Sequence, residues 1–185
     1  MNVLLGAGAA LLLMIFATIV ALGRMVRAHT RVIEARTALD FQLHRRHDLV
    51  APLVQAVSVY ARHEQPLFAH VTEVRSELLR QPGSGFGPLL ENQLATAIAA
   101  LIALPERYPE LAASHHFNLL VDDLALVECE IQSAATEYSR AAETFNARVK
   151  WFLPSTVAVA FGYQAANPVS LNTTRELLST AAVAA

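Results

Sequence analysis

The chain has 185 residues, of which 54% are apolar, 16% are charged and one is a cysteine, and its formal net charge is −2. This apolar content is enough to form a packed core, which excludes intrinsic disorder. A single cysteine excludes a disulfide scaffold, and a slightly acidic chain lacks the basic surface typical of nucleic-acid binding. We therefore expect a folded protein with no nucleic-acid partner.

The first 23 residues form an apolar segment without any charged side chain, and eighteen of them are apolar. About 22 residues of helix extend about 33 Å, which is enough to cross the hydrocarbon core of a membrane. A cleaved signal peptide would instead have a basic start and a shorter apolar run. We predict that 1–23 is an uncleaved transmembrane anchor.

Three arginines, Arg24, Arg27 and Arg31, directly follow this segment. Basic residues flanking a span stay on the cytoplasmic side of the membrane. We therefore predict a single-pass protein that has the lipid bilayer as a partner and most of its chain in the cytoplasm.

Helical periodicity continues through the middle of the chain. Apolar residues spaced three and four apart predict a long helix over 24–63, in which Pro52 marks a kink or a new helix start. Pro66 is expected to end this helix, and 67–80 to form a shorter one. The segment QPGSGFGP over 81–88 predicts a loop, and 89–104 another helix.

The last long helix is predicted over 113–153, where apolar residues recur every seven positions. One row of this seam contains Phe117, Leu124, Ile131, Tyr138, Phe145 and Phe152. The second row contains Val121, Glu128, Ala135, Ala142 and Val149. A sustained repeat of seven indicates left-handed packing of helices, as in a coiled coil.

The two long helices, 24–63 and 113–153, have almost equal lengths, and we expect them to pack antiparallel. The predicted fold is all-α: an amino-terminal transmembrane helix continues into a long antiparallel up-and-down bundle of three to four helices. The expected domains are the anchor 1–23, a cytoplasmic bundle over 24–163 and a poorly ordered tail over 164–185.

Matching the two long helices end to end places residue 46 opposite about residue 131. The charged residues that interrupt their apolar seams are Arg46 and Glu128. We therefore predict that these two residues form an ion pair inside the bundle. Such a pair adds little net stability but penalises a shifted register.

Several segments of the chain resemble the LemA family of bacterial membrane proteins. They are ALDFQLHRRHDLVAPLV (38–54), VYARHE (59–64), LLENQLATAIAAL (89–101), the segment from Glu106 to Leu120, EYSRAAETFN (137–146) and FLPSTVAVAFGY (152–163). The resemblance implies an amino-terminal anchor, a cytoplasmic bundle of long helices and no established catalytic activity. It also implies the bacterial inner membrane as the location.

No motif in the chain predicts a metal, a cofactor or a catalytic residue. His44 and His47 share a helix face, but the chain has neither HExxH nor Glu-x-x-His, so we expect solvated surface histidines. Cys129 lies between two acids that disfavour a thiolate, and we expect it to be a small buried or boundary residue. The cluster Arg45–Asp48 is the best candidate for a ligand site, although a helix face with a register pair is the favoured interpretation.

Four aromatic residues near the end of the last helix are candidates for contact with the membrane interface: Trp151, Phe152, Phe161 and Tyr163. If this helix returns towards the bilayer, these side chains lie at headgroup depth, which tryptophan and tyrosine favour. The alternative is that the segment caps the end of the bundle.

These observations predict a non-enzymatic scaffold or adaptor at the inner membrane, which associates with itself or with a protein partner of unknown identity. The alternative is a regulatory partner of another membrane protein, such as a membrane protease.

Overall fold

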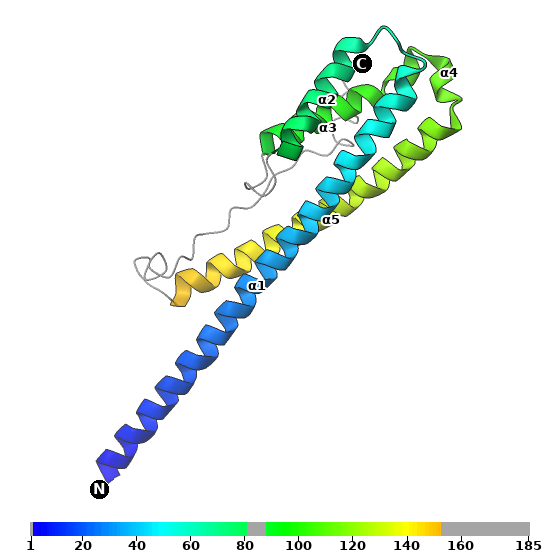
Figure 1. Cartoon of the computed structure of the whole chain (residues 1–185). Helices are drawn as coiled ribbons and strands as arrows, with labels where there is room; N and C mark the ends of the chain where they lie inside the picture. Colours follow the sequence, from blue (N-terminus) through cyan, green and yellow to red (C-terminus); the bar gives the residue numbers. More distant parts are fainter. Residues whose placement is uncertain (1, 81–87, 153–185) are drawn as a thin grey trace. The chain divides into compact units, whose positions relative to one another are not determined.

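The computed structural model describes residues 2–80 and 88–152, and all regular elements in these ranges are helical (Figure 1). The long helices are α1 (Asn2–Ser58), α2 (Gln65–Arg80), α3 (Pro88–Ile102) and α5 (His115–Phe152). A 3-10 turn, η1 (Leu104–Glu106), and a short helix, α4 (Pro109–Ala112), connect α3 to α5. The prediction of an all-α fold is confirmed for these residues. Residues 81–87 of the predicted loop and the predicted tail 164–185 lie outside the described residues.

These residues divide into two compact units, and α1 and α5 contribute to both. The first unit contains 2–37 and 137–152, and the second contains 38–80 and 88–136. In the first unit, Arg148 Nη1 donates a hydrogen bond to the Arg24 carbonyl (3.0 Å), and the Phe145 ring lies 5.5 Å from the His29 ring. Since later residues of α5 contact earlier residues of α1, the two helix segments are antiparallel there.

Helix α1 contains the first of the two prolines and ends well before the second. It runs through Pro52 and ends at Ser58, so Pro52 does not start a new helix. The apolar stripe of α1 continues past Pro52 into the core, and this burial offsets the cost of about 3 kcal/mol for a proline inside a helix. The chain then turns over 59–64, where the Ala61 amide donates to the Val57 carbonyl (3.0 Å). Pro66 lies in the first turn of α2, where a missing amide hydrogen has little cost.

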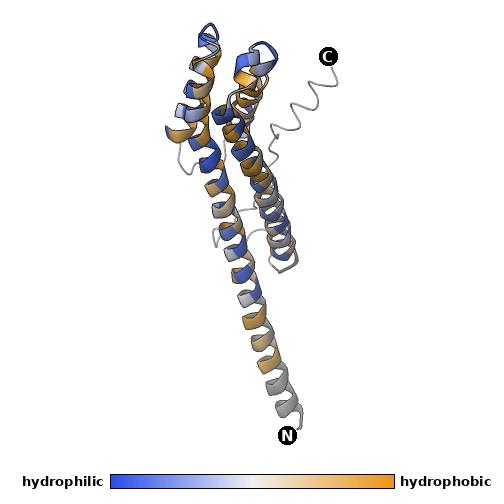
Figure 2. Ribbon diagram, turned by 90° about the vertical axis from the view of Figure 1, so that its right-hand side faces the viewer, coloured by the Kyte–Doolittle hydropathy of each residue, from blue (hydrophilic) through white to orange (hydrophobic). Residues whose placement is uncertain are grey.

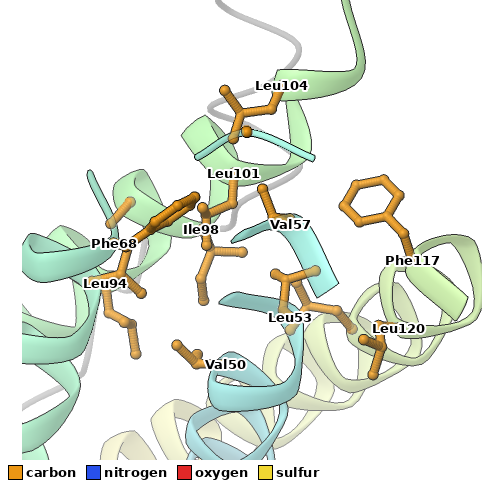
Figure 3. Packing of buried hydrophobic residues seen from close by; sticks show 14 of the residues in the cluster. Val50, Leu53, Val57, Phe68, Leu94, Ile98, Leu101, Leu104, Phe117 and Leu120 are labelled. Atoms are coloured by element: carbon orange, nitrogen blue, oxygen red, sulfur yellow. The ribbon is translucent and has the colours of Figure 1, made fainter. Parts of the chain in front are cut away.

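The core of the second unit receives side chains from α1, α2, α3, η1 and α5 (Figure 3). Its labelled members are Val50, Leu53, Val57, Phe68, Leu94, Ile98, Leu101, Leu104, Phe117 and Leu120. On α1 and α3 these residues recur at intervals of three and four, so each helix turns one apolar face towards the others. A core built from all these elements fixes the helices of this unit against one another.

Most of the seven-residue seam of α5 is buried, among the members whose side chains the structure describes. Buried members are Phe117, Leu124, Glu128, Ile131, Ala135, Tyr138, Ala142 and Phe145, whereas Val121 and Val149 are half-buried. The seam therefore predicted the buried face of α5 in both units.

Among the described residues, one segment is long and apolar enough to cross a membrane, and it is Pro88–Glu106. This segment contains α3 and η1, and its side chains Leu94, Ile98 and Leu101 are completely buried in the second unit. A buried core helix can have the length and composition of a membrane span, and these contacts make α3 a core helix. The predicted anchor over 1–23 stays a prediction.

Candidate functional site: a buried charge cluster

The second unit buries four polar side chains beside its apolar core. They are Arg46 and His47 on α1, Glu91 on α3 and Glu128 on α5, and each is at most 5% exposed. We call these four residues the buried charge cluster. Charged side chains are rarely buried to this extent unless they are paired, so their partners define what the cluster does.

Arg46 lies at the centre of the cluster and contacts both carboxylates. Its Nη1 donates to Glu128 Oε1 at 3.1 Å, and its Nη2 donates to Glu91 Oε2. A guanidinium presents several donors in one plane, so a single arginine can hold carboxylates from two other helices. The structure thus brings together the two residues of the predicted pair, Arg46 and Glu128, and adds Glu91 as a third member.

His47 approaches the same carboxylate from the neighbouring position of α1. Its Nε2 lies 3.1 Å from Glu91 Oε1 and 3.3 Å from Oε2. An ionised carboxylate only accepts hydrogen bonds, so the Nε2 atom of His47 carries the donated proton. Glu91 therefore accepts hydrogen bonds from two consecutive side chains of α1.

Helix α2 joins the cluster through the backbone. Arg75 Nε donates to the His47 carbonyl at 2.6 Å, and the Arg75 side chain is half-buried. Because this carbonyl lies within α1, the bond fixes α2 at the level of the cluster. The cluster and Arg75 together contact every long helix of the second unit.

An exposed ion pair lies next to the cluster. Arg45 Nη1 contacts Glu130 Oε2, and both side chains are nearly half exposed. Arg45 Nη1 also donates to Gln42 Oε1 at 3.1 Å. Solvent screens such a pair, so we expect it to contribute at most about 1 kcal/mol.

Glu91 is held as a carboxylate despite its burial. Burial alone raises the pKa of Glu91, but the hydrogen bond from His47 and the positive charge of Arg46 outweigh this effect. The pKa of Glu91 is therefore lowered from its ordinary value. A carboxylate that stays ionised in the interior serves as a permanent partner for Arg46 rather than as a proton donor.

The local sequence explains why each charge enters the interior. Arg46 lies between Leu43 and Val50 on the buried stripe of α1, and Glu91 precedes Leu94 by three residues on the stripe of α3. Glu128 occupies a position of the α5 seam. Helical spacing therefore turns each charge inward together with its apolar neighbours.

The charged atoms of the cluster face one another across three helices, so their contacts fix how α1, α3 and α5 align. The structure also contains a groove of about 500 Å³ in the first unit, and none of the four cluster residues lines it. Replacing a member would leave a buried charge without its partner, at a cost of about 3–5 kcal/mol. We conclude that the cluster selects one register of α1, α3 and α5.

The other predicted site residues are described only in part. Trp151 and Phe152 belong to the last turn of α5, but only their backbone is described, and Phe161 and Tyr163 lie outside the described residues. The membrane-interface prediction therefore stays a prediction.

Two predictions about burial were wrong. Cys129 is exposed, because it follows the buried Glu128 and lies one residue outside the seam. His47 is buried rather than solvated, because Glu91 provides an acceptor in the interior. His44, three residues before His47, is exposed as expected.

Glu91 is the member that the sequence did not suggest, whereas His47 belonged to the candidate cluster Arg45–Asp48 but was expected in solvent. The signal for Glu91 was available, since this acid interrupts the apolar stripe of α3 as Glu128 interrupts that of α5. His47 gave a weaker signal, because it lies beside the seam position Arg46. Only the placement of α3 against α1 shows that both side chains point at one carboxylate.

The fold and the cluster define a helical-bundle protein with an ionic centre in its second unit. A sequence model of the LemA family matches residues 35–180, which is most of the chain, so the chain belongs to the LemA family. It is also similar to Protein LemA of Metamycoplasma hominis, with 23% identity over 135 residues. This stretch covers 72% of the chain and 62% of that relative's length.

Proposed function

We propose that the chain is a non-enzymatic scaffold or adaptor, anchored by 1–23 in the bacterial inner membrane and carrying its bundle in the cytoplasm. The observation that carries this proposal is the continuity of α1. One helix extends from Asn2 to Ser58, and it contains both the uncharged segment and the residues Arg46 and His47 of the cluster. The second unit is thereby linked covalently to the anchor, and a partner bound to it would be held at the membrane.

Exposed apolar side chains on the first part of α1 support membrane anchoring. Leu12, Leu13, Met14, Phe16 and Ile19 are each more than 60% exposed, and no charged residue accompanies them before Arg24. Figure 2 shows this stretch of α1 in the hydrophobic colour wherever it is coloured. In water this stripe would be unfavourable, whereas lipid tails would cover it.

The non-enzymatic part of the proposal rests on the chemistry of the cluster. Arg46 pairs with Glu91 and Glu128, and His47 donates to Glu91, so these side chains are engaged in holding helices together.

Membrane extraction tests the anchor. We expect the wild-type chain to remain in the membrane pellet in alkaline carbonate, and Leu12→Arg/Phe16→Arg to be released. Each arginine near the centre of a span costs about 2.5–3.5 kcal/mol. The matched control is Leu119→Arg/Leu126→Arg on α5, whose side chains are also exposed, and it should remain in the pellet. Equal release of both variants would contradict the anchor.

Cross-linking in intact membranes before solubilisation separates the two kinds of partner. A scaffold that assembles with itself should give homo-oligomers in membranes that contain no other protein. A regulator of another membrane protein, such as a protease, should give a mixed product in native membranes and none in reconstituted ones. The latter result would favour the regulatory role over the scaffold.

A further inference from the structure

The first unit contains a groove between α1 and α5 that the proposed function does not use. Its volume is about 500 Å³, which is within the range of small-molecule sites. Alanines contribute Ala28, Ala35 and Ala141 to its lining. The other lining residues are Arg31, Glu34, Glu137, Arg140, Thr144 and Arg148.

The charges in the groove are ordered along its length. Arg148 bonds to the Arg24 carbonyl, so this end of the groove is near the start of the segment that follows Gly23. Arg31 lies further along α1, and Glu34 lies one turn beyond Arg31. On the antiparallel α5, Glu137 comes eleven residues before Arg148. Arg31 and Arg148 therefore lie towards the end near residue 24, and Glu34 and Glu137 lie towards the opposite end, where Arg140 pairs with Glu137 at 3.9 Å.

From this order we infer that the groove binds the headgroup of an aminophospholipid, with its phosphate against Arg31 and Arg148 and its amine towards Glu34 and Glu137. The inference rests on the proposed anchor, because a bound headgroup must remain attached to the acyl chains in the bilayer. The end with Arg31 and Arg148 faces the direction from which such a headgroup would enter.

The distance of the groove from the end of the predicted span agrees with a lipid headgroup as its ligand. Ala28 and Arg31 lie five and eight residues beyond Gly23, which is about 8 Å and 12 Å along a helix. The polar headgroup layer adds about 5–8 Å on each side of the hydrocarbon core. Long arginine side chains reach back towards this layer while their backbone lies beyond it. Arg31 and Arg148 can therefore meet a lipid phosphate at its natural depth.

The chemistry of the side chains favours a headgroup with two charges. Arginine binds phosphate oxygens through paired hydrogen bonds, and a carboxylate accepts hydrogen bonds from a primary ammonium group. Arg31 and Glu34 are three residues apart on one face of α1 and both line the groove, so a headgroup whose phosphate meets Arg31 can extend its amine towards Glu34. A choline headgroup carries no N–H donor, and a glycerol headgroup carries no positive charge, so both fit the carboxylate end less well.

The existing contacts of the groove leave most of its charges available, although Arg148 Nη1 donates to the Arg24 carbonyl. Arg140 and Glu137 form only a long, exposed ion pair of 3.9 Å. Arg31 and Glu34 take part in none of the salt bridges found among the described residues, although they lie one turn apart. A ligand would therefore not have to break a strong internal ion pair before it binds.

The test uses the full chain in nanodiscs with equal amounts of phosphatidylethanolamine, phosphatidylglycerol and phosphatidylcholine. After mild detergent release, native mass spectrometry counts the lipids retained by each chain. We expect one phosphatidylethanolamine per wild-type chain, well above the other two lipids. Arg31→Gln/Arg148→Gln should lower this occupancy roughly tenfold or more, because two charge-assisted contacts are lost. Glu34→Gln/Glu137→Gln should still retain phospholipid but should lose the preference for ethanolamine over choline.

The matched control is Arg24→Gln/Arg27→Gln, which removes two positive charges from the same stretch without changing a side chain that lines the groove. This variant should retain lipid like the wild type. Equal retention of the three lipids, an equal loss in the control, or displacement of the lipid by millimolar inorganic phosphate would each overturn the inference. A wild-type chain that does not enter nanodiscs would overturn the anchor itself, whereas an embedded chain without retained lipid would refute only the groove site.

Discussion

Arg46 on α1 and Glu128 on α5 are 82 residues apart in the sequence, and their side chains meet at 3.1 Å in the interior of the second unit. The same guanidinium contacts Glu91 on α3, so one arginine holds three helices. Two carboxylates around one arginine are tolerated because His47 donates a further hydrogen bond to Glu91. Each member of the cluster therefore depends on the others, and single substitutions should be costly.

Replacing Arg46 by methionine is expected to lower the free energy of unfolding by about 3–5 kcal/mol, because Glu91 and Glu128 would remain buried without their cation. Urea unfolding of the full chain in detergent, followed by circular dichroism, measures the change. Arg45→Met is the control at the adjacent position, and it should cost at most about 1 kcal/mol because its ion pair with Glu130 is exposed.

The triple variant Arg46→Met/Glu91→Leu/Glu128→Leu completes this test. It removes all three charges at once and leaves apolar side chains in their place, so much of the lost stability should return. A triple variant that is as unstable as Arg46→Met would contradict the view that unpaired charge is the cause of the loss.

Lowering the pH should weaken the second unit through Glu91. The pKa of Glu91 is lowered in the folded chain, so its stabilising effect is complete above the unfolded pKa of about 4.3. This effect is lost as the pH falls through the folded pKa. The difference in unfolding free energy between wild type and Glu91→Gln should therefore be constant from pH 7 to about 5 and shrink below about pH 4.

The control for this pH dependence is Glu130→Gln, which alters an exposed ion pair. Its difference from the wild type should be small throughout the same pH range. A difference for Glu91→Gln that persists unchanged at pH 3 would show that Glu91 is not stabilised by its charge.

Much of this architecture was predictable from the spacing of residues along single helices. The seven-residue seam identified the buried face of α5, and matching the lengths of two helices placed residue 46 opposite about residue 131. In the structure the partner of Arg46 is Glu128, less than one helical turn from that position. The pairing could be predicted because both residues interrupt otherwise apolar seams.

The rest depends on how separate helices approach one another. The sequence contains no signal that α3 places Glu91 between Arg46 and His47, because this depends on the path of the chain through α2, η1 and α4. The end of α1 at Ser58 was missed for a similar reason. Local propensity favours continuing the helix, but Ala61 must reach the core and α2 must reverse direction.

Helix α3 should behave as a core helix rather than a membrane span. The Ile98 side chain is completely buried, and truncation to alanine is expected to cost about 2–5 kcal/mol through the lost contacts and the cavity. Leu89→Ala is the control on the same helix, since Leu89 is 71% exposed and should change the stability by no more than about 0.5 kcal/mol. Equal effects of the two variants on urea unfolding would contradict the packing of α3 in the second unit.

The single cysteine should report on which side of the membrane the second unit lies. Cys129 is exposed on α5, so a maleimide reagent should label the folded chain without denaturant. If the bundle is cytoplasmic, a membrane-impermeant maleimide should leave intact spheroplasts unlabelled and label one thiol per chain after lysis. Because the thiol is already exposed in the folded chain, protection in spheroplasts would reflect the membrane barrier and not burial. Cys129→Ser gives the background, and complete labelling in intact spheroplasts would place the second unit outside the cytoplasm.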